Sequence, residues 1–427
     1  MSLPASLPTL TFTGLLLAGL FAKAAEPASP WKTTESVTAK IGYDDNLFLQ
    51  DKNPLSINPN GAPANAGSMV CTTSLALGAI WSPSQALVLD TSYSSEITRY
   101  DGEYSSEDHT DHNFSAGVGG KLSSWSYAAK GSFLSVDGSK TAPIFGQLGG
   151  GPAIGAAPVR DRRAQNLIKA SAKLTREFDH GFVRVGGAYS DWDFLTEQKS
   201  TAGYCNYVDR YEWSVSPEAG WYVRKDFALV AGVRVGEQRQ APLLGSPVQY
   251  SNNFTRYLVG VEGKPVDILS LALMAGPDRR DFAPGAGVTI GSKTARYIEA
   301  SAIWTPAKAD TLTLSGKDFL WLNASGKGVY QSSVYDLQWK RALNPKWSFN
   351  SGANVQVGDN RPYNTDTAKD QNSWIYTASL GATCAITAKT RLDLGLNRSW
   401  SDSYLNTSKP GREYTRWQAS LAVKYTF

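Results

Sequence analysis

The stretch WQASLAVKYTF, from Trp417 to Phe427, carries a strictly alternating pattern to the last residue of the chain. Every second position is apolar, and most of the positions between them are polar: the apolar set is Trp417, Ala419, Leu421, Val423, Tyr425 and Phe427. A period of two predicts a β-strand with one apolar and one polar face. The question is what covers that apolar face.

The same alternation recurs along the chain, for example in DFALVAGVRVG (226–236), KWSFNSGANVQVG (346–358) and RLDLGLNRSW (391–400). Eighteen such segments are expected, and they start near residues 35, 69, 86, 113, 125, 165, 182, 208, 227, 252, 266, 295, 309, 328, 347, 373, 389 and 414. Short connections such as SPSQ (82–85) alternate with long ones such as 138–162. This predicts an even-stranded antiparallel meander whose two termini lie on the short-turn side.

A membrane is the expected surrounding of this meander. The segments run to about ten residues, which is the length that a tilted strand needs to cross a bilayer, whereas strands of a soluble β-sandwich, the alternative fold, are shorter. Large aromatic residues flank the short turns and would form a periplasmic girdle: Trp81, Trp125, Tyr222, Phe227, Trp304, Trp339 and Trp347. Since an open sheet edge is costly in hydrocarbon, the sheet must close on itself. The fold prediction is an all-β, transmembrane, antiparallel up-and-down β-barrel of about 18 strands, with 16 as the lower bound.

The N-terminal residues predict export. An apolar run, LTFTGLLLAGLF (10–21), is followed by AKA (22–24), the small-x-small pattern of a signal-peptidase site. We therefore expect a signal peptide at 1–24, an outer-membrane barrel at 25–427, and location in the outer membrane of a Gram-negative bacterium. Tyr425 and Phe427 resemble the C-terminal signature of such proteins, which the barrel-assembly machinery reads. The formal net charge of +4 gives no reason to expect a nucleic-acid partner.

The first expected strand ends in KIGYDDNLF (40–48). This run resembles the opening of the β-barrel porin 2 family of outer-membrane proteins, some of which accompany polysaccharide-export genes. The resemblance implies an outer-membrane barrel and transfers no catalytic residue. Asp44, Asp45 and Asn46 are good turn formers leaving a strand; a cation site or a latch for a loop is the alternative reading of these three residues.

If the apolar parity faces lipid, the other parity lines a lumen. The basic residues expected there are Lys40, Lys121, Lys130, Lys169, Lys173, Arg184, Arg210, Arg234, Arg256, Lys317, Lys340, Arg391, Arg416 and Lys424. The acidic ones are Asp90, Glu96, Glu212, Glu218, Glu262, Glu299, Asp336 and Asp393. The site prediction names eight pore-lining residues: Lys169, Lys173, Arg184, Arg234, Arg256, Arg391, Arg416 and Lys424. The excess predicts a mildly positive interior, unless these charges only pair with one another.

The histidines argue against an enzyme. Outer-membrane hydrolases need a histidine near carboxylates or a serine, and here His109 and His112 lie in EDHTDH while His180 lies in a short turn. EDHTDH is expected to be an acidic solvated loop, with a divalent-cation site as the alternative. The long loop Gly138 to Arg162 has an uncharged, Gly- and Ala-rich centre, so it is expected either to narrow the pore or to pack over the barrel mouth.

The functional prediction is a passive, porin-like diffusion channel for small hydrophilic solutes, mildly anion-preferring, without catalytic residues, cofactor or metal. The expected partners are outer-membrane lipid, lipopolysaccharide, the barrel-assembly machinery and the transported solutes. The alternatives are a conduit or accessory for exopolysaccharide export, and a closed barrel that serves as a structural or adhesive surface protein.

Overall fold

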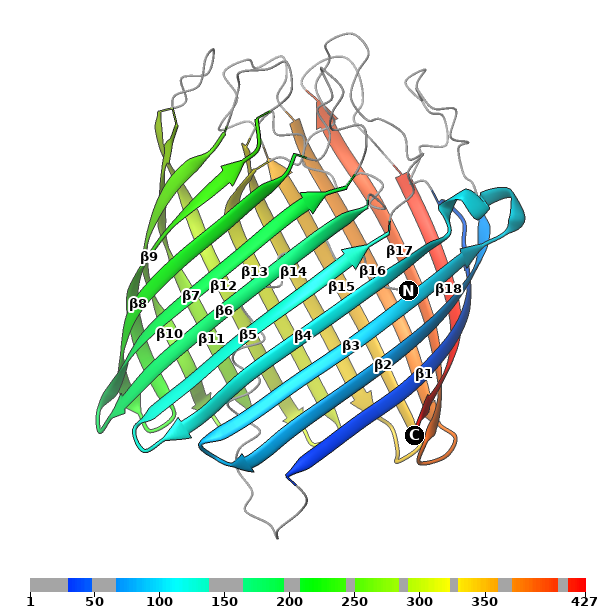
Figure 1. Ribbon diagram of the computed structural model, residues 1–427, viewed down its shortest axis with the longest axis horizontal. Helices are drawn as coiled ribbons and strands as arrows, with labels where there is room; N and C mark the ends of the chain where they lie inside the picture. The colour runs from blue at the N-terminus through cyan, green and yellow to red at the C-terminus, as the bar shows by residue number, and fades with distance from the viewer. Residues whose placement is uncertain are drawn as a thin grey trace.

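The computed structural model describes residues 30–47, 67–137, 164–195, 208–242, 250–283, 291–322, 329–359, 371–405 and 414–427. These residues form one closed sheet of 18 strands, drawn in Figure 1. The expected signal peptide and the loop from Gly138 to Arg162 lie outside the described residues. Within the described part of the chain, no helix is long and apolar enough to cross a membrane.

The strands follow one another along the chain. Their bounds are β1 Trp31–Asp44, β2 Ser68–Ser84, β3 Leu87–Tyr100, β4 His109–Leu122, β5 Trp125–Val136, β6 Gln165–Phe178, β7 Gly181–Phe194, β8 Arg210–Arg224, β9 Phe227–Gln240, β10 Asn252–Val266, β11 Leu269–Phe282, β12 Ser292–Ala307, β13 Asp310–Leu322, β14 Val329–Ala342, β15 Trp347–Asp359, β16 Gln371–Ala385, β17 Thr390–Leu405 and β18 Tyr414–Thr426, with a short 3-10 helix, η1, at Gly102–Glu107 between β3 and β4.

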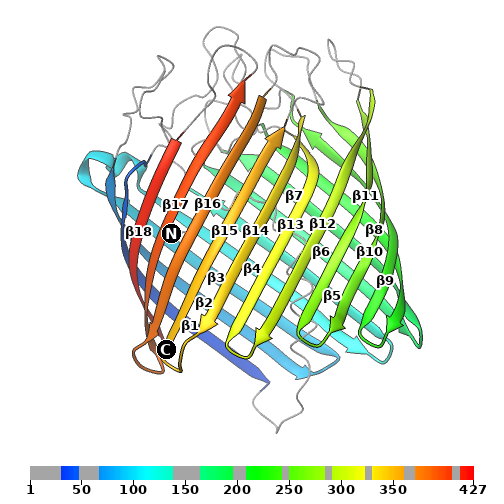
Figure 2. The same ribbon diagram turned by 180° about the vertical axis from the view of Figure 1, so that it is seen from behind.

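Each strand pairs antiparallel with the next, and β1 pairs with β18 to close the barrel. That seam runs from Ser36 opposite Thr426 to Asp44 opposite Gln418. The tilted strands and short turns at one end are visible from both sides (Figures 1 and 2), with the C-terminus at the short-turn end. The predicted 18-stranded up-and-down barrel is therefore confirmed.

The alternation located the strands well. No observed strand begins more than four residues from its expected start. The largest differences are at the first and fourth strands, which begin at residues 31 and 109 where 35 and 113 were expected. The strands are longer than the expected ten residues, from 12 in β5 to 17 in β2. The extra length arises because strands continue past the apolar belt into the turns and loops.

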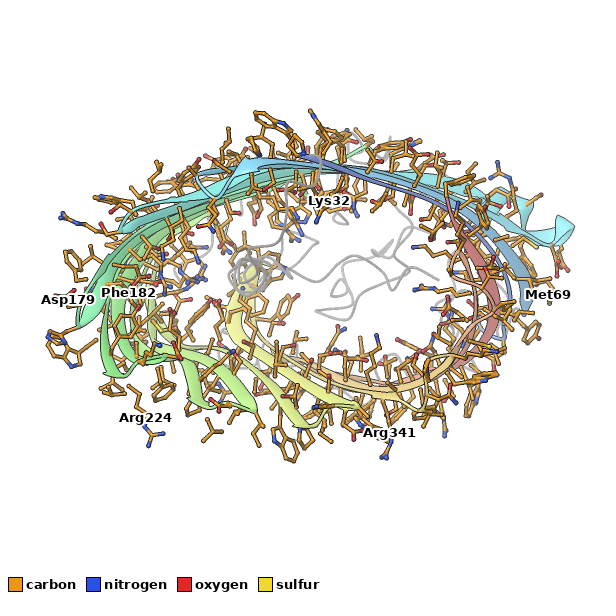
Figure 3. The ribbon with its side chains drawn as sticks, turned by 90° about the horizontal axis from the view of Figure 1, so that it is seen from below. Lys32, Met69, Asp179, Phe182, Arg224 and Arg341 are labelled. Atoms are coloured by element: carbon orange, nitrogen blue, oxygen red, sulfur yellow. The ribbon has the colours of Figure 1, made fainter. Side chains whose placement is uncertain are left out.

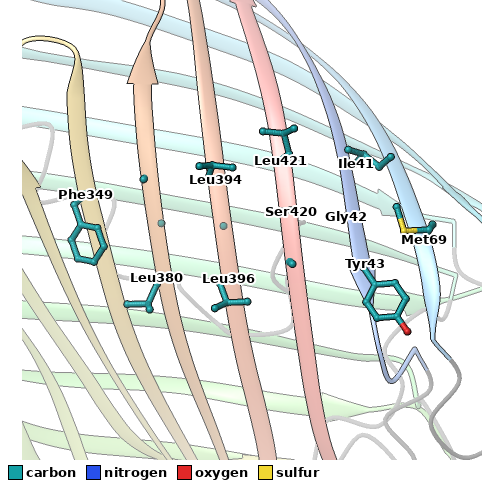
Figure 4. Close-up of a pocket in the computed structure, with 14 residues that line it drawn as sticks. Ile41, Gly42, Tyr43, Met69, Phe349, Leu380, Leu394, Leu396, Ser420 and Leu421 are labelled. Carbon is teal, nitrogen blue, oxygen red and sulfur yellow. The ribbon is translucent and has the colours of Figure 1, made fainter.

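The outer face of the sheet exposes large apolar side chains. Leu394 on β17 is 47% exposed, Val185 on β7 is 52% exposed and Val259 on β10 is 65% exposed, while their sequence neighbours point into the barrel. In water such a surface would be unfavourable by about 25 cal/mol for each Å² of apolar area. Across the β1–β18 seam this face carries a shallow apolar depression, shown in Figure 4 and lined by residues that include Ile41, Tyr43, Met69, Leu380, Leu396 and Leu421.

Aromatic side chains stand on the outer face beside the short turns. Trp125, Trp304 and Trp347 are each at least 40% exposed there. The prediction for Tyr222 is wrong: its hydroxyl lies in the lumen and donates to Glu177 Oε2 at 2.5 Å. Its neighbour Trp221, 61% exposed, takes the outward position, so the girdle is shifted by one residue in β8.

Candidate functional site: the lumen and its packed end

The strand register places the predicted lumen residues on the face opposite the exposed apolar side chains. The eight named in the site prediction are Lys169 and Lys173 on β6, Arg184 on β7, Arg234 on β9, Arg256 on β10, Arg391 on β17, and Arg416 and Lys424 on β18. Whether solutes pass along them is a separate question. Their surroundings divide them into arginines held in ion pairs and lysines that are not.

The hairpin of β13 and β14 leaves the barrel wall near its extracellular end. β12 pairs with β13 only up to Ile298 opposite Asp318, although β12 itself continues to Ser292 beside β11. β13 and β14 stay paired with each other up to Leu322 opposite Val329. β14 in turn stays paired with β15 up to Gln331 opposite Asp359. We call residues 319–322 of β13 and 329–330 of β14 the hairpin arm. Figure 3 shows the yellow ribbon of this hairpin turning into the interior.

The hairpin arm packs against the inner faces of distant strands. Leu320 and Leu322 are 1% and 2% exposed and form a cluster with Ala295 of β12. Trp321 meets Trp192 of β7 edge to face, with 5.5 Å between ring centroids. The arm therefore crosses from β13 to β7 and fills one end of the lumen, which we call the packed end: the space enclosed by β7 to β13.

A sequence signal for this inward turn exists. The segment KDFLWL (317–322) breaks the alternation, because four consecutive residues from Phe319 to Leu322 are apolar. A strand with two apolar faces is one that is buried on both faces. A strand that contacts lipid on one side must therefore meet protein on the other.

Charged side chains of the packed end form ion pairs. Arg280 and Arg256 both donate to Asp278 Oδ2, at 2.9 and 3.0 Å. Arg280 also donates to Gln238 Oε1 at 2.6 Å and to Asn252 Oδ1 at 3.0 Å. Arg280 and Asp278 are completely buried. The site prediction named Arg256 but missed Arg280 and Asp278, because their strand segment, GPDRRDF (276–282), lacks an apolar alternation that would assign its faces.

Two further arginines of the packed end are neutralised in the same way. Arg184 donates to Glu218 at 2.7 Å and to both oxygens of Glu262 at 3.1 and 2.9 Å. Arg234 donates to the hydroxyl of Tyr297 at 2.8 Å and to Glu299 Oε2 at 3.3 Å.

These arginines follow the alternative expectation: charged side chains of the lumen pair with one another. They hold the packed end together, and their charges are balanced locally.

The rest of the lumen, which we call the open part, is lined by β14 to β18 and β1 to β6. Its lysines have no ion pair with any residue in the described ranges: Lys40, Lys121, Lys130, Lys169, Lys340 and Lys424. Among the described residues of this part, Arg391 is paired with Asp393 at 2.9 Å beside the short turn before β17, and Arg416 is paired with Asp44 at the opposite end of the wall. Between these charges the wall carries small hydroxyl and amide side chains, such as Ser92 and Ser115, which bond to each other at 2.8 Å. These six lysines outnumber the carboxylates Asp90, Glu96 and Asp336, which face the same part of the lumen, so the open part has a positive, hydrophilic surface.

Asp44, Asp45 and Asn46 hold the barrel seam. The Asp44 carboxylate accepts from Arg416 Nε at 2.9 Å and from Gln418 Nε2 at 3.0 Å, both on β18. Asp45 Oδ1 accepts from the Trp417 backbone N–H at 2.7 Å, and Asn46 donates its amide to the Thr415 carbonyl at 3.0 Å. These contacts favour the latch reading over a cation site, with the first strand latched to the last one rather than to a loop.

The histidines do not form a metal site together. His109 and His112 lie in β4 on opposite faces of the strand, so EDHTDH is not the solvated loop that we expected. His109 is 7% exposed beside Tyr100, with 6.0 Å between ring centroids, while His112 Nδ1 lies 3.0 Å from the Tyr93 hydroxyl on the outer face. Both histidines are used in packing.

These observations define the class of protein. A closed antiparallel barrel with an even number of strands, an exposed apolar outer face and a charged interior is an outer-membrane β-barrel. The protein is therefore located in the bacterial outer membrane.

Comparison with known proteins adds no narrower assignment. No family model matches the chain, and no curated protein matches its sequence, so the resemblance of residues 40–48 to the porin 2 family stays a prediction. Among solved structures, the outer membrane protein OpdK from Pseudomonas aeruginosa has 9% identity, covering 93% of this chain and 99% of its own, with a TM-score of 0.45. OccAB4 from Acinetobacter baumannii has 10% identity, covering 93% and 98%, with a TM-score of 0.41. A ferric enterobactin receptor from Pseudomonas aeruginosa has 10% identity, covering 95% and 82%, with a TM-score of 0.45. At these values the likeness carries no argument about function.

Proposed function

We propose that the barrel is a passive diffusion channel for small hydrophilic solutes, with a mild preference for anions, and that solutes pass through the open part of the lumen. The observation that carries this proposal is the contrast between the two parts: the arginines of the packed end are paired, and the lysines of the open part are not. The positive charge that a solute would meet therefore comes from the lysines. The proposal includes no enzymatic step, metal or cofactor.

Unpaired lysines on a lumen wall attract anions through the local potential, and salt weakens that attraction. In planar bilayers, the protein should give a reversal potential on the anion side in a KCl gradient. The preference should fade between 0.1 M and 1 M salt, because the Debye length falls from about 10 Å to about 3 Å.

The triple variant Lys130→Gln, Lys169→Gln and Lys340→Gln should move that reversal potential toward zero. A matched control removes the same charge from the short turns outside the lumen, through Lys225→Gln, Lys308→Gln and Lys389→Gln, and should leave it near the wild-type value. Cation preference of the wild type at low salt would overturn the anion proposal. Absence of any conductance would overturn the channel and favour a closed structural or adhesive barrel.

A conduit for polysaccharide is the second candidate, and the amide-rich wall of β14 and β15 favours it. Gln356 donates to Asn354 at 3.3 Å, and Asn354 and Gln338 donate to Asp336 at 3.5 and 3.1 Å. Amide groups can both donate to and accept from sugar hydroxyls. Block of the single-channel current by one oligosaccharide, but not by others of equal size, would support this candidate over general diffusion.

The proposed partners follow from the two faces of the wall. The exposed apolar belt and its depression at the seam fit the acyl chains of outer-membrane lipid and lipopolysaccharide. Tyr425 and Phe427, whose rings meet edge to face at 5.0 Å, are proposed as the signal for the barrel-assembly machinery. The transported solutes are the remaining partners.

A further inference from the structure

The hairpin arm leaves two backbone carbonyls of β13 without the strand partner that the register would give them. If the pairing of Ile298 with Asp318 continued, Leu320 and Leu322 would lie opposite Arg296 and Thr294 of β12. β13 has turned inward at this level, so β12 does not bond to it. A buried carbonyl without a donor costs about 1–3 kcal/mol, and a second donor is therefore needed for each.

Two arginines from other strands of the packed end supply those donors. Arg280 of β11 donates from Nη2 to the Leu320 carbonyl at 3.2 Å. Arg210 of β8 donates from Nη1 to the Leu322 carbonyl at 3.2 Å. Guanidinium groups suit this role because they present several donors in a rigid plane. Side chains of β8 and β11 thus replace the hydrogen bonds of a neighbouring strand.

Arg280 is fixed independently of the arm, whereas Arg210 is held in part by the arm itself. Arg280 is held by Asp278, as described above, and it is completely buried. The guanidinium of Arg210 lies beside two indole rings that meet edge to face, 5.0 Å from the centroid of Trp192 and 4.8 Å from that of Trp321. A cation within about 6 Å of a ring centroid is attracted by the ring quadrupole. Because one ring belongs to β7 and the other to the arm, Arg210 also joins the two walls.

The edge of β12 next to the arm is tied by side chains as well. Arg296 donates to Asp318 Oδ2 at 2.5 Å, and Gln331 donates to the Arg296 carbonyl at 3.1 Å. The wall is therefore sealed at the point where the strands part, and Asp318 is only 2% exposed.

From these contacts we infer that Arg210 and Arg280 are the residues that set the width of the pore, and with it the size limit of the solutes that pass. They do so by holding the hairpin arm inside the lumen, where it partitions the packed end from the open part. The alternative position of the arm is paired with β12 in the wall, which would leave a wider lumen. The effect on solute size rests on the proposed channel function. The position of the arm can be tested independently of that function.

The conductance test replaces each arginine by lysine and by glutamine. Lysine keeps the charge but cannot donate in the forked geometry, so Arg210→Lys with Arg280→Lys should still fold and should raise single-channel conductance at least twofold, and Arg210→Gln with Arg280→Gln should raise it further. The matched control is Arg224→Gln, because Arg224 also donates to a backbone carbonyl, that of Pro265 at 2.9 Å, but at the periplasmic rim outside the lumen (Figure 3). Unchanged conductance of heat-modifiable, folded arginine variants would overturn the inference.

The position test uses a disulfide and needs no conduction. In a chain whose three natural cysteines are replaced by alanine, Thr294→Cys with Leu322→Cys should crosslink only when the arm pairs with β12. We expect no crosslink with both arginines present and a crosslink in the Arg210→Lys, Arg280→Lys background. A crosslink in the presence of both arginines would refute the inward position. If the wild type does not conduct, the channel proposal fails, and this crosslink still decides the role of the arginines.

Discussion

Removing the Asp44 charge should weaken the closed barrel, because Asp44 connects the first and last strands. The Asp44 side chain is 3% exposed and that of Arg416 is 21% exposed. Breaking a buried ion pair by removing one partner costs about 3–5 kcal/mol. Since Arg416 can regain some water, we expect Asp44→Asn to lower the free energy of unfolding by about 3 kcal/mol. Urea titration of the protein refolded in lipid vesicles, followed by tryptophan fluorescence, measures this value.

The matched control is Asp393→Asn, which breaks a pair of similar length with Arg391 at 2.9 Å. The Arg391 side chain is 53% exposed, and an exposed pair contributes about 0–1 kcal/mol. A double-mutant cycle of Asp44→Asn and Arg416→Gln should give a coupling energy above about 1 kcal/mol, since residues in one network are not additive. Equal losses for the two aspartates, or a coupling near zero, would refute the argument that the seam depends on this pair.

Three other outcomes are expected. Deleting Phe427 should lower the folded, heat-modifiable fraction in membranes and leave secretion intact; unchanged assembly would remove the terminal signal from the argument. An epitope tag in the turn Asn344–Lys346 should be hidden on intact cells, whereas a tag at Thr365, outside the described residues, should be accessible; surface labelling of the turn would reverse the topology. Gly260→Ala should destabilise the barrel by about 1–3 kcal/mol in urea titration, because an added Cβ would lie 1.7 Å from a carbonyl oxygen of β11, while Gly102→Ala, with open space around it, should have no effect.

The strand positions and the faces of most strands were readable from the sequence because alternation is a local property. In β17, for example, Leu394 and Leu396 face outward as the pattern of RLDLGLNRSW predicts. Closure also followed, since an open edge is too costly in hydrocarbon. The error at Tyr222 arose because the residue was assigned to the girdle from its closeness to the short turn, although its parity with Glu212 and Glu218 indicates the lumen face.

The ion-pair partners of the charged lumen residues could not be predicted from the alternation of the sequence. Sequence parity placed Arg184 and Arg416 on the inner face, but their carboxylate partners Glu262 and Asp44 are 78 and 372 residues away in the chain. Which side chains meet depends on the stagger of strands around the barrel and on closure of the seam. The distinction between paired arginines and unpaired lysines therefore exists only in the closed barrel.

The sequence by itself determined an 18-stranded outer-membrane barrel with a charged lumen, because a repeating period of two and the cost of unpaired backbone in lipid leave few other solutions. Only the tertiary structure decided the shape of the lumen. Phe319 to Leu322 are apolar on both faces, and their inward course depends on Arg210 and Arg280, which come from strands that are not neighbours of β13. A hydrogen bond between a side chain and a carbonyl of a distant strand leaves no periodic pattern in the sequence, so it could not be predicted from the sequence.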